Sequence, residues 1–183
     1  MEPAAFASLD ATALRWLRTQ EAPIAFQLLS GDTLAADLTW KSHGGTLAVA
    51  RTASATWTLK RVGFLNPRAS LRLEGATSDL ARVSIHLNYH RIDIVGAPSY
   101  RFHRAGVLLP AWQVTSDSGE QILHIEPVRD GRKLIGGAVV TSARGAKLPE
   151  LPILLVLSWY TIVLAWFEDE AFVPLEGEGV PRA

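Results

Sequence analysis

The sequence predicts a mainly β (α+β) protein, a closed antiparallel β-barrel of about 10–12 strands that encloses a hydrophobic C-terminal α-helix. Between residues 23 and 145, short segments of alternating polar and apolar residues follow one another, separated by turn residues. No helix-length periodic segment interrupts them, which argues against a doubly wound α/β fold. A long run without any charged residue, Leu151–Phe167, then follows near the C-terminus.

Residues 1–22 are predicted to form a helical or irregular lead-in to the barrel. Apolar residues recur at spacings of three and four in Ala4–Gln20, a pattern that favours a short amphipathic helix. A strand that begins near Leu14 fits the same residues almost as well. Pro23 ends either element.

The barrel strands are assigned to residues 23–145. Arg68–Glu74 and Ala81–Leu87 are the clearest, because their apolar and polar residues alternate as in a sheet with one buried and one solvated face. The other predicted strands are separated by short turn segments: Ala25–Leu29, Leu34–Trp40, Thr46–Arg51, Thr56–Arg61, His90–Ile94, Tyr100–His103, Pro110–Thr115, Gln121–Glu126 and Leu134–Val140.

The apolar run is assigned to a helix over residues 150–168, followed by a tail over residues 169–183. Glu150 and Pro152 suit a helix start. Acidic residues are unfavourable at a helix C-terminus, so we expect Glu168–Glu170 to mark the return of the chain to solvent.

Two main environments are open to this helix. A membrane-spanning helix needs about 20 apolar residues, and the run is somewhat shorter, although Arg144 and Lys147 would fit a tail anchor. A helix that is apolar on every side must otherwise be buried on every side, and a barrel of about eleven or more strands is wide enough to hold one. Enclosure explains more, because the strands upstream need a core. A helix on the surface or at an oligomer interface is a third alternative.

Composition limits the classes of function. The chain has 183 residues, which suits a single domain, and its 18 basic residues equal its 18 acidic residues in number. A nucleic-acid-binding protein would normally carry a basic excess, so we expect no nucleic-acid partner. The absence of cysteine excludes disulfides, thiolate nucleophiles and cysteine-ligated metals. The segment Met1–Asp10 lacks the apolar core of a signal peptide, so we expect a cytoplasmic protein.

One arrangement of elements resembles a known superfamily. The segment Trp57–Leu65, a paired strand and turn, is followed by the strand that contains Arg72, and Leu151–Phe167 lies at the far end. In this arrangement the chain resembles the tubby C-terminal-like superfamily, which includes tubby proteins, phospholipid scramblases and LURP-one-related proteins, and it looks like a divergent bacterial-type member. The resemblance covers most of residues 24–167. It implies a closed barrel around a hydrophobic helix, and a basic face that binds phosphoinositide head groups, as in tubby domains.

Basic residues are the main candidates for a binding site. Lys60, Arg61, Arg68 and Arg72 lie close together in the chain, and Arg82 follows on the next strand. Alternation places Arg68, Arg72 and Arg82 on the outer face of the barrel. Guanidinium groups bind phosphates in bidentate fashion, so a cluster of them could hold an anionic lipid. The alternative is a solvated face, since acidic residues are interleaved: Glu74, Asp79 and Asp93.

Other candidate sites are weaker. His86, His90 and His103 could supply three nitrogens to a metal, but histidine is also common on a polar barrel face. The segment Asp117–Glu120 has the oxygens of a calcium loop without the spacing, so we expect a hairpin turn. The sequence contains no nucleophile elbow, P-loop or dinucleotide motif. We therefore expect no catalytic residue, no metal and no cofactor.

These observations favour a non-enzymatic binding module that docks on anionic phospholipid or phosphoinositide head groups and lies in the cytoplasm, peripheral to a membrane. One alternative is a structural or protein-interaction domain with no small ligand. Another is a membrane-anchored, scramblase-like lipid-handling protein, which would require a true membrane helix.

Overall fold

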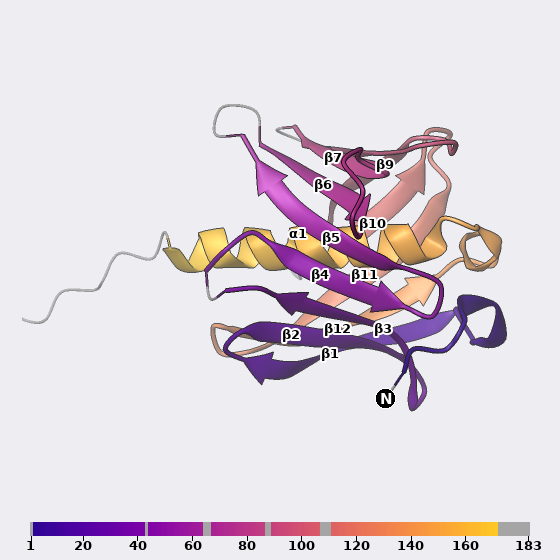
Figure 1. Ribbon diagram of the computed structural model, residues 1–183. Helices are drawn as coiled ribbons and strands as arrows, with labels where there is room; N and C mark the ends of the chain where they lie inside the picture. The colour runs from indigo at the N-terminus through magenta and orange to yellow at the C-terminus, as the bar shows by residue number, and fades with distance from the viewer. Residues whose placement is uncertain (1, 43, 64–66, 87–88, 107–110, 172–183) are drawn as a thin grey trace, which may run out of the picture.

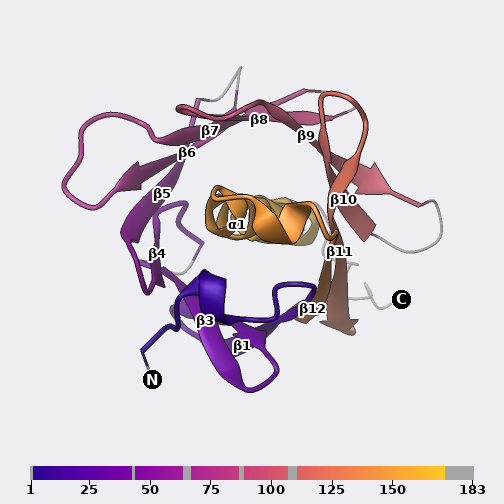
Figure 2. The same cartoon turned by 90° about the vertical axis from the view of Figure 1, so that its right-hand side faces the viewer.

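The protein forms a closed β-barrel around one long helix (Figures 1 and 2). The computed structural model describes residues 2–42, 44–63, 67–86, 89–106 and 111–171. Of residues 168–171 it describes only the backbone. The strands over these residues are β1 (Ala13–Glu21), β2 (Ile24–Ser30), β3 (Thr33–Trp40), β4 (Ala48–Thr52), β5 (Thr56–Val62), β6 (Arg68–Leu73), β7 (Ala81–Ile85), β8 (His90–Ile94), β9 (Tyr100–Ala105), β10 (Ala111–Ser116), β11 (Gln121–Asp130) and β12 (Lys133–Thr141).

The topology is an antiparallel meander. Each strand pairs with its neighbours in sequence, and β1 pairs with β12 to close the barrel. The predicted strands from residue 25 to residue 140 are confirmed, with small shifts at their ends. Leu87 and Pro110, each at the end of a predicted strand, lie outside the described residues. Closure removes the free sheet edges that would otherwise invite pairing with other chains.

The predicted helix over Ala4–Gln20 is wrong. This segment contains only a short 3₁₀ turn, Phe6–Ser8, before β1 begins at Ala13, so the alternative of a strand near Leu14 is confirmed. Leu14 and Trp16 are buried while their neighbours face outward, which is a period of two. The barrel therefore begins at residue 13 rather than 23. Pairing with both β2 and β12 outweighs the local helical spacing.

The helix α1 (Leu151–Ala171) runs along the axis of the barrel, and Figure 2 shows the strands surrounding it. Every side chain from Leu154 to Leu164 is buried, so the helix is covered on all sides and the prediction of enclosure is confirmed. None of the helices in the described part of the chain has the length and hydropathy needed to cross a membrane.

The helix continues three residues beyond its predicted end at residue 168, to Ala171. Arg18 and Arg129 lie at this end of the barrel, near Trp166, and positive charge there favours the negative end of the helix dipole.

Aromatic packing fixes the helix against one side of the barrel. The indole of Trp159 stacks on that of Trp16, with ring centroids 5.5 Å apart and planes 6° apart. Tyr160 stacks on Trp40 with centroids 5.6 Å apart. Gly137 on β12 leaves the room that the ring of Trp159 occupies, since a Cβ at Gly137 would lie 2.7 Å from Cζ3 of that ring.

Hydrogen bonds of polar side chains hold both ends of the helix in place. At its start, the hydroxyl of Tyr100 on β9 donates to the buried carboxylate of Glu150. Near its end, the indole Nε1 of Trp166 donates to the backbone carbonyl of Arg132, at 2.8 Å. These bonds fix the position of the helix along the barrel axis.

Candidate functional site

The basic residues predicted from the sequence lie mostly on the outer face of β5, β6 and β7. Strand register places Lys60, Ser70 and Arg82 in one row across the three strands. Arg72 lies two residues from Ser70 along β6, on the same face, and Arg68 lies two residues from it in the other direction. Directly paired side chains are about 5 Å apart at Cβ, so this face brings four of the predicted residues together.

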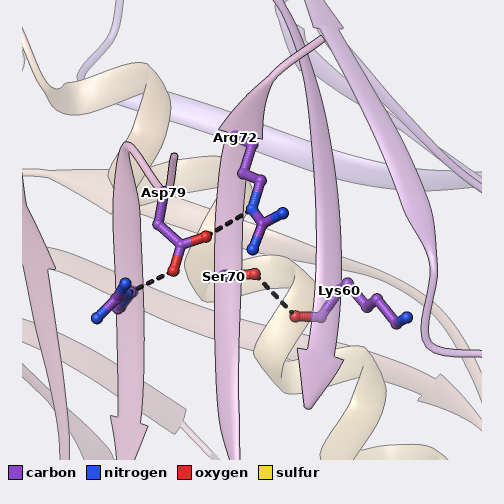
Figure 3. Close-up of polar contacts among 5 residues, drawn as sticks. Lys60, Ser70, Arg72 and Asp79 are labelled. Atoms are coloured by element: carbon purple, nitrogen blue, oxygen red, sulfur yellow. Dashed lines mark hydrogen bonds and ion pairs between the residues drawn. The ribbon is translucent and has the colours of Figure 1, made fainter. Parts of the chain in front are cut away.

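Asp79, in the turn before β7, holds two of these arginines (Figure 3). One carboxylate oxygen accepts from Nε of Arg72 at 2.6 Å, and the other accepts from Nε of Arg82 at 2.5 Å. The side chain of Asp79 is only 9% exposed, whereas those of Arg72 and Arg82 are 44% and 53% exposed. A largely buried carboxylate therefore orients two guanidinium groups that remain open to solvent.

The charge of Asp79 is maintained by its partners. Burial alone would raise the pKa of this carboxyl, but the hydrogen bonds and charges of Arg72 and Arg82 outweigh burial and lower the pKa below its ordinary value. The three side chains thus form an ionised unit with one net positive charge at neutral pH.

Lys60 and Arg68 complete the predicted cluster on this face. Both are exposed, and in the described part of the chain neither has a carboxylate partner. The hydroxyl of Ser70 donates to the backbone carbonyl of Lys60 at 3.4 Å, as Figure 3 also shows, so it joins β5 to β6 between the two basic side chains.

The basic face extends further around the barrel than the predicted site residues. The row that contains Arg68 continues through Ser84 to Arg91 on β8 and Arg101 on β9, which lie directly opposite each other. Like charges in directly paired positions destabilise a sheet. Arg91 pairs with Asp93 at 2.8 Å, and the guanidinium of Arg101 lies over the ring of Tyr89. We define the basic outer face as six residues: Lys60, Arg68, Arg72, Arg82, Arg91 and Arg101.

Arg61 does not join the basic outer face. In β5 the inward positions are Trp57, Leu59 and Arg61, so the Arg61 side chain lies on the inner side, at the barrel end where the helix C-terminus emerges. It lines a pocket there with His90, Arg104 and Trp112.

The histidines considered for a metal site do not converge. His90 points inward and stacks on Trp112, with ring centroids 5.9 Å apart, whereas His86 is exposed and stacks on Tyr89. Within the described ranges, no three metal-ligating side chains lie together. The segment Asp117–Glu120 forms the predicted hairpin turn between β10 and β11, where the amide of Gly119 donates to the carbonyl of Ser116.

Comparison with known proteins identifies no relative of the chain. Neither protein-family models, curated proteins nor solved structures give a match to the chain. The function is therefore argued from the geometry of the chain itself.

Proposed function

We propose that the protein is a non-enzymatic binding module that docks on anionic phospholipid head groups through the basic outer face. The observation that carries this proposal is the pair of arginines oriented by Asp79. Both bonds use the Nε atoms of the arginines, so the terminal amino groups of Arg72 and Arg82 face solvent and can donate to a second anion.

Prior orientation favours binding to phosphate. A free arginine side chain loses roughly 2 kcal/mol of rotamer entropy when it is fixed, and Asp79 has already fixed two of them. Each guanidinium then offers a planar pair of donors that matches two phosphate oxygens. Lys60 and Arg68 lie beside them and add charge without further carboxylates.

The shape of the face suits a membrane surface. The six cations lie on adjacent strands of one barrel wall, so they spread over a broad area instead of lining a deep pocket. Near an anionic bilayer, each Lys or Arg contributes about 1 kcal/mol to binding, and salt screens the attraction. Many weak contacts of this kind would give a peripheral, salt-sensitive association at the cytoplasmic side of a membrane.

The fold supports the same proposal. A closed antiparallel barrel around a C-terminal helix is consistent with the tubby-like architecture that the sequence resembles. We propose that the chain is a divergent member of that superfamily. In tubby domains a basic face binds phosphoinositide head groups, which is the role assigned here to the basic outer face.

Liposome flotation tests the proposal. We expect the protein to float with phosphoinositide-containing vesicles at low salt, to be released at high salt, and not to float with neutral vesicles. The double variant Arg68→Glu with Arg72→Glu should lower partitioning by roughly 30-fold or more. A matched control reverses Arg15 and Lys133, which lie on β1 and β12 across the barrel.

Two outcomes would contradict the proposal. If the folded Arg68 and Arg72 variant partitions as the wild type does, the basic outer face is not the binding site. If the wild type floats with neither kind of vesicle, lipid binding is wrong, and a protein-interaction domain becomes the better reading. The place to look for such an interface is the pair of exposed apolar residues Leu17 and Val128, which flank Gly136 of β12 on the opposite wall.

A further inference from the structure

A cavity of about 470 Å³ lies at the end of the barrel where the helix begins, the end that faces the viewer in Figure 2. Three segments that are far apart in the sequence meet around it: the 3₁₀ turn before β1, the turn between β4 and β5, and the stretch that leads into α1. The volume lies within the range of about 300–1,000 Å³ that is usual for pockets that bind small molecules.

The lining of this cavity is mostly apolar. Nine of the eleven residues that line it are apolar, and four of these are alanines, whose small side chains leave the space open. Phe6 and Leu148 are partly buried against the hydrophobic core, and Leu151 belongs to that core, so the inner side of the cavity is continuous with it. A concave apolar surface of this kind suits a hydrocarbon chain, which gains free energy when it leaves water.

Hydrogen bonds within the protein hold each wall of the cavity. In the turn between β4 and β5, the hydroxyl of Thr52 donates to the carbonyl of Ala55 and accepts from its amide, each at 3.2 Å. Before the helix, the amide of Leu148 donates to the carbonyl of Gly145 at 3.1 Å, and backbone bonds also close the 3₁₀ turn Phe6–Ser8. The cavity is therefore formed in advance, and a ligand that enters it need not order its walls.

Lys147 carries the only charge among the described residues that line the cavity. Its side chain is exposed, and within the described ranges no carboxylate pairs with it. Arg144, three residues earlier, differs in this respect, because its guanidinium donates to the carboxylate of Glu120. An ammonium group has three donors and no acceptor, so the ammonium of Lys147 can bind an anion at the open side of the cavity.

We propose that this cavity binds the anion of a medium-chain fatty acid. The hydrocarbon chain lies against Phe6, Leu148 and Leu151, and the carboxylate accepts from Nζ of Lys147. One ammonium matches the single charge of a carboxylate, and the nine apolar residues match the chain. The volume lies in the lower half of the usual range, so the chain is of medium length.

Isothermal titration calorimetry with decanoate tests the proposal. We expect saturable binding of decanoate and at least tenfold weaker binding of butyrate, because each methylene group that leaves water strengthens binding about fourfold. Lys147→Gln should weaken decanoate binding about three- to fivefold, which is the usual contribution of an exposed ion pair, and should leave the binding of decanol unchanged. Lys41→Gln is the matched control, since Lys41 is also exposed but follows β3 at the opposite end of the barrel.

A second variant tests where the chain lies. Ala53 lines the cavity but is exposed in the turn between β4 and β5, so a larger side chain can replace it without disturbing the core. Ala53→Phe should fill part of the cavity and weaken decanoate binding at least tenfold. Ala138→Phe makes the same change at an exposed position on the outer face of β12, and should leave the binding unchanged.

A measurement on the wild type covers the case in which a variant does not fold. Decanoate that carries a nitroxide on its chain should broaden the NMR signals of the methyl groups of Ala53 and Ala146, and leave that of Ala138 sharp. No saturable binding of decanoate, equally strong binding of butyrate, or broadening that spares Ala53 and Ala146 would each overturn the proposal. This site is separate from the basic outer face, so reversal of Arg68 and Arg72 should leave decanoate binding unchanged, which separates failure here from failure of lipid docking.

Discussion

Replacing Gly137 by alanine tests how closely the helix packs against the barrel. A Cβ on this residue would lie 2.7 Å and 2.8 Å from Cζ3 and Cη2 of Trp159, and 3.0 Å from the carbonyl oxygen of Glu126. The indole cannot swing away freely, because it stacks on Trp16 and meets the edge of Phe26, with centroids 5.4 Å apart. The methyl group can be accommodated only if the helix or strand β12 moves.

The size of the effect follows from this geometry. Overpacking a well-filled core costs about 1–3 kcal/mol. Alanine also restricts the unfolded chain more than glycine does, which stabilises by about 0.4–1 kcal/mol and offsets part of the loss. A net loss of about 1–2 kcal/mol should lower Tm by roughly 2–8 °C for a chain of this size.

Thermal and urea unfolding measure this loss. Ala138→Ser is the matched control, because Ala138 is the next residue and faces outward, and it should change the stability little. Adding Trp159→Phe removes the atoms that clash, so Gly137→Ala should cost less in that background, and a double-mutant cycle measures the difference. If Gly137→Ala is as stable as the wild type, or if the cycle gives no coupling, the close approach of helix and strand is wrong.

Three further predictions concern single side chains. Tyr100→Phe removes the hydroxyl that donates a hydrogen bond to the buried carboxylate of Glu150, and should lower the free energy of unfolding by about 1–3 kcal/mol. An unchanged urea midpoint would contradict this contact. The pKa of Asp79 is lowered in the folded state, so its stabilising contribution is present above the unfolded pKa and is lost as pH falls through the folded value. Unfolding midpoints measured from pH 5 to pH 2 should therefore fall less steeply for Asp79→Asn than for the wild type; parallel curves would argue against the ion pairs. The pKa of His90 is lowered in the folded state, so as the pH falls below about 6.5 the imidazole is protonated in the unfolded chain before it is protonated in the folded one. The free energy of unfolding should therefore decrease in this pH range, and His90→Phe should remove that part of the pH dependence.

Most of the fold could be predicted because period-two alternation is a local property. Arg68–Glu74 shows its buried and exposed faces without any knowledge of its neighbours, and the uncharged helix had to be covered on all sides. The segment before Ala13 misled the prediction. Phe6, Leu9 and Ala13 continue into Trp16 at helical spacing, and only the pairing of Trp16 with Gly137 on the last strand shows that the residue belongs to a sheet.

The candidate site was predictable in part for the same reason. Alternation correctly placed Arg72 and Arg82 outside, but it could not show that Asp79, in a turn between their strands, would hold both of them. The same alternation applied to Thr56–Val62 would have placed Arg61 inside. The alternation in this strand was therefore enough to predict that Arg61 does not belong to the basic outer face.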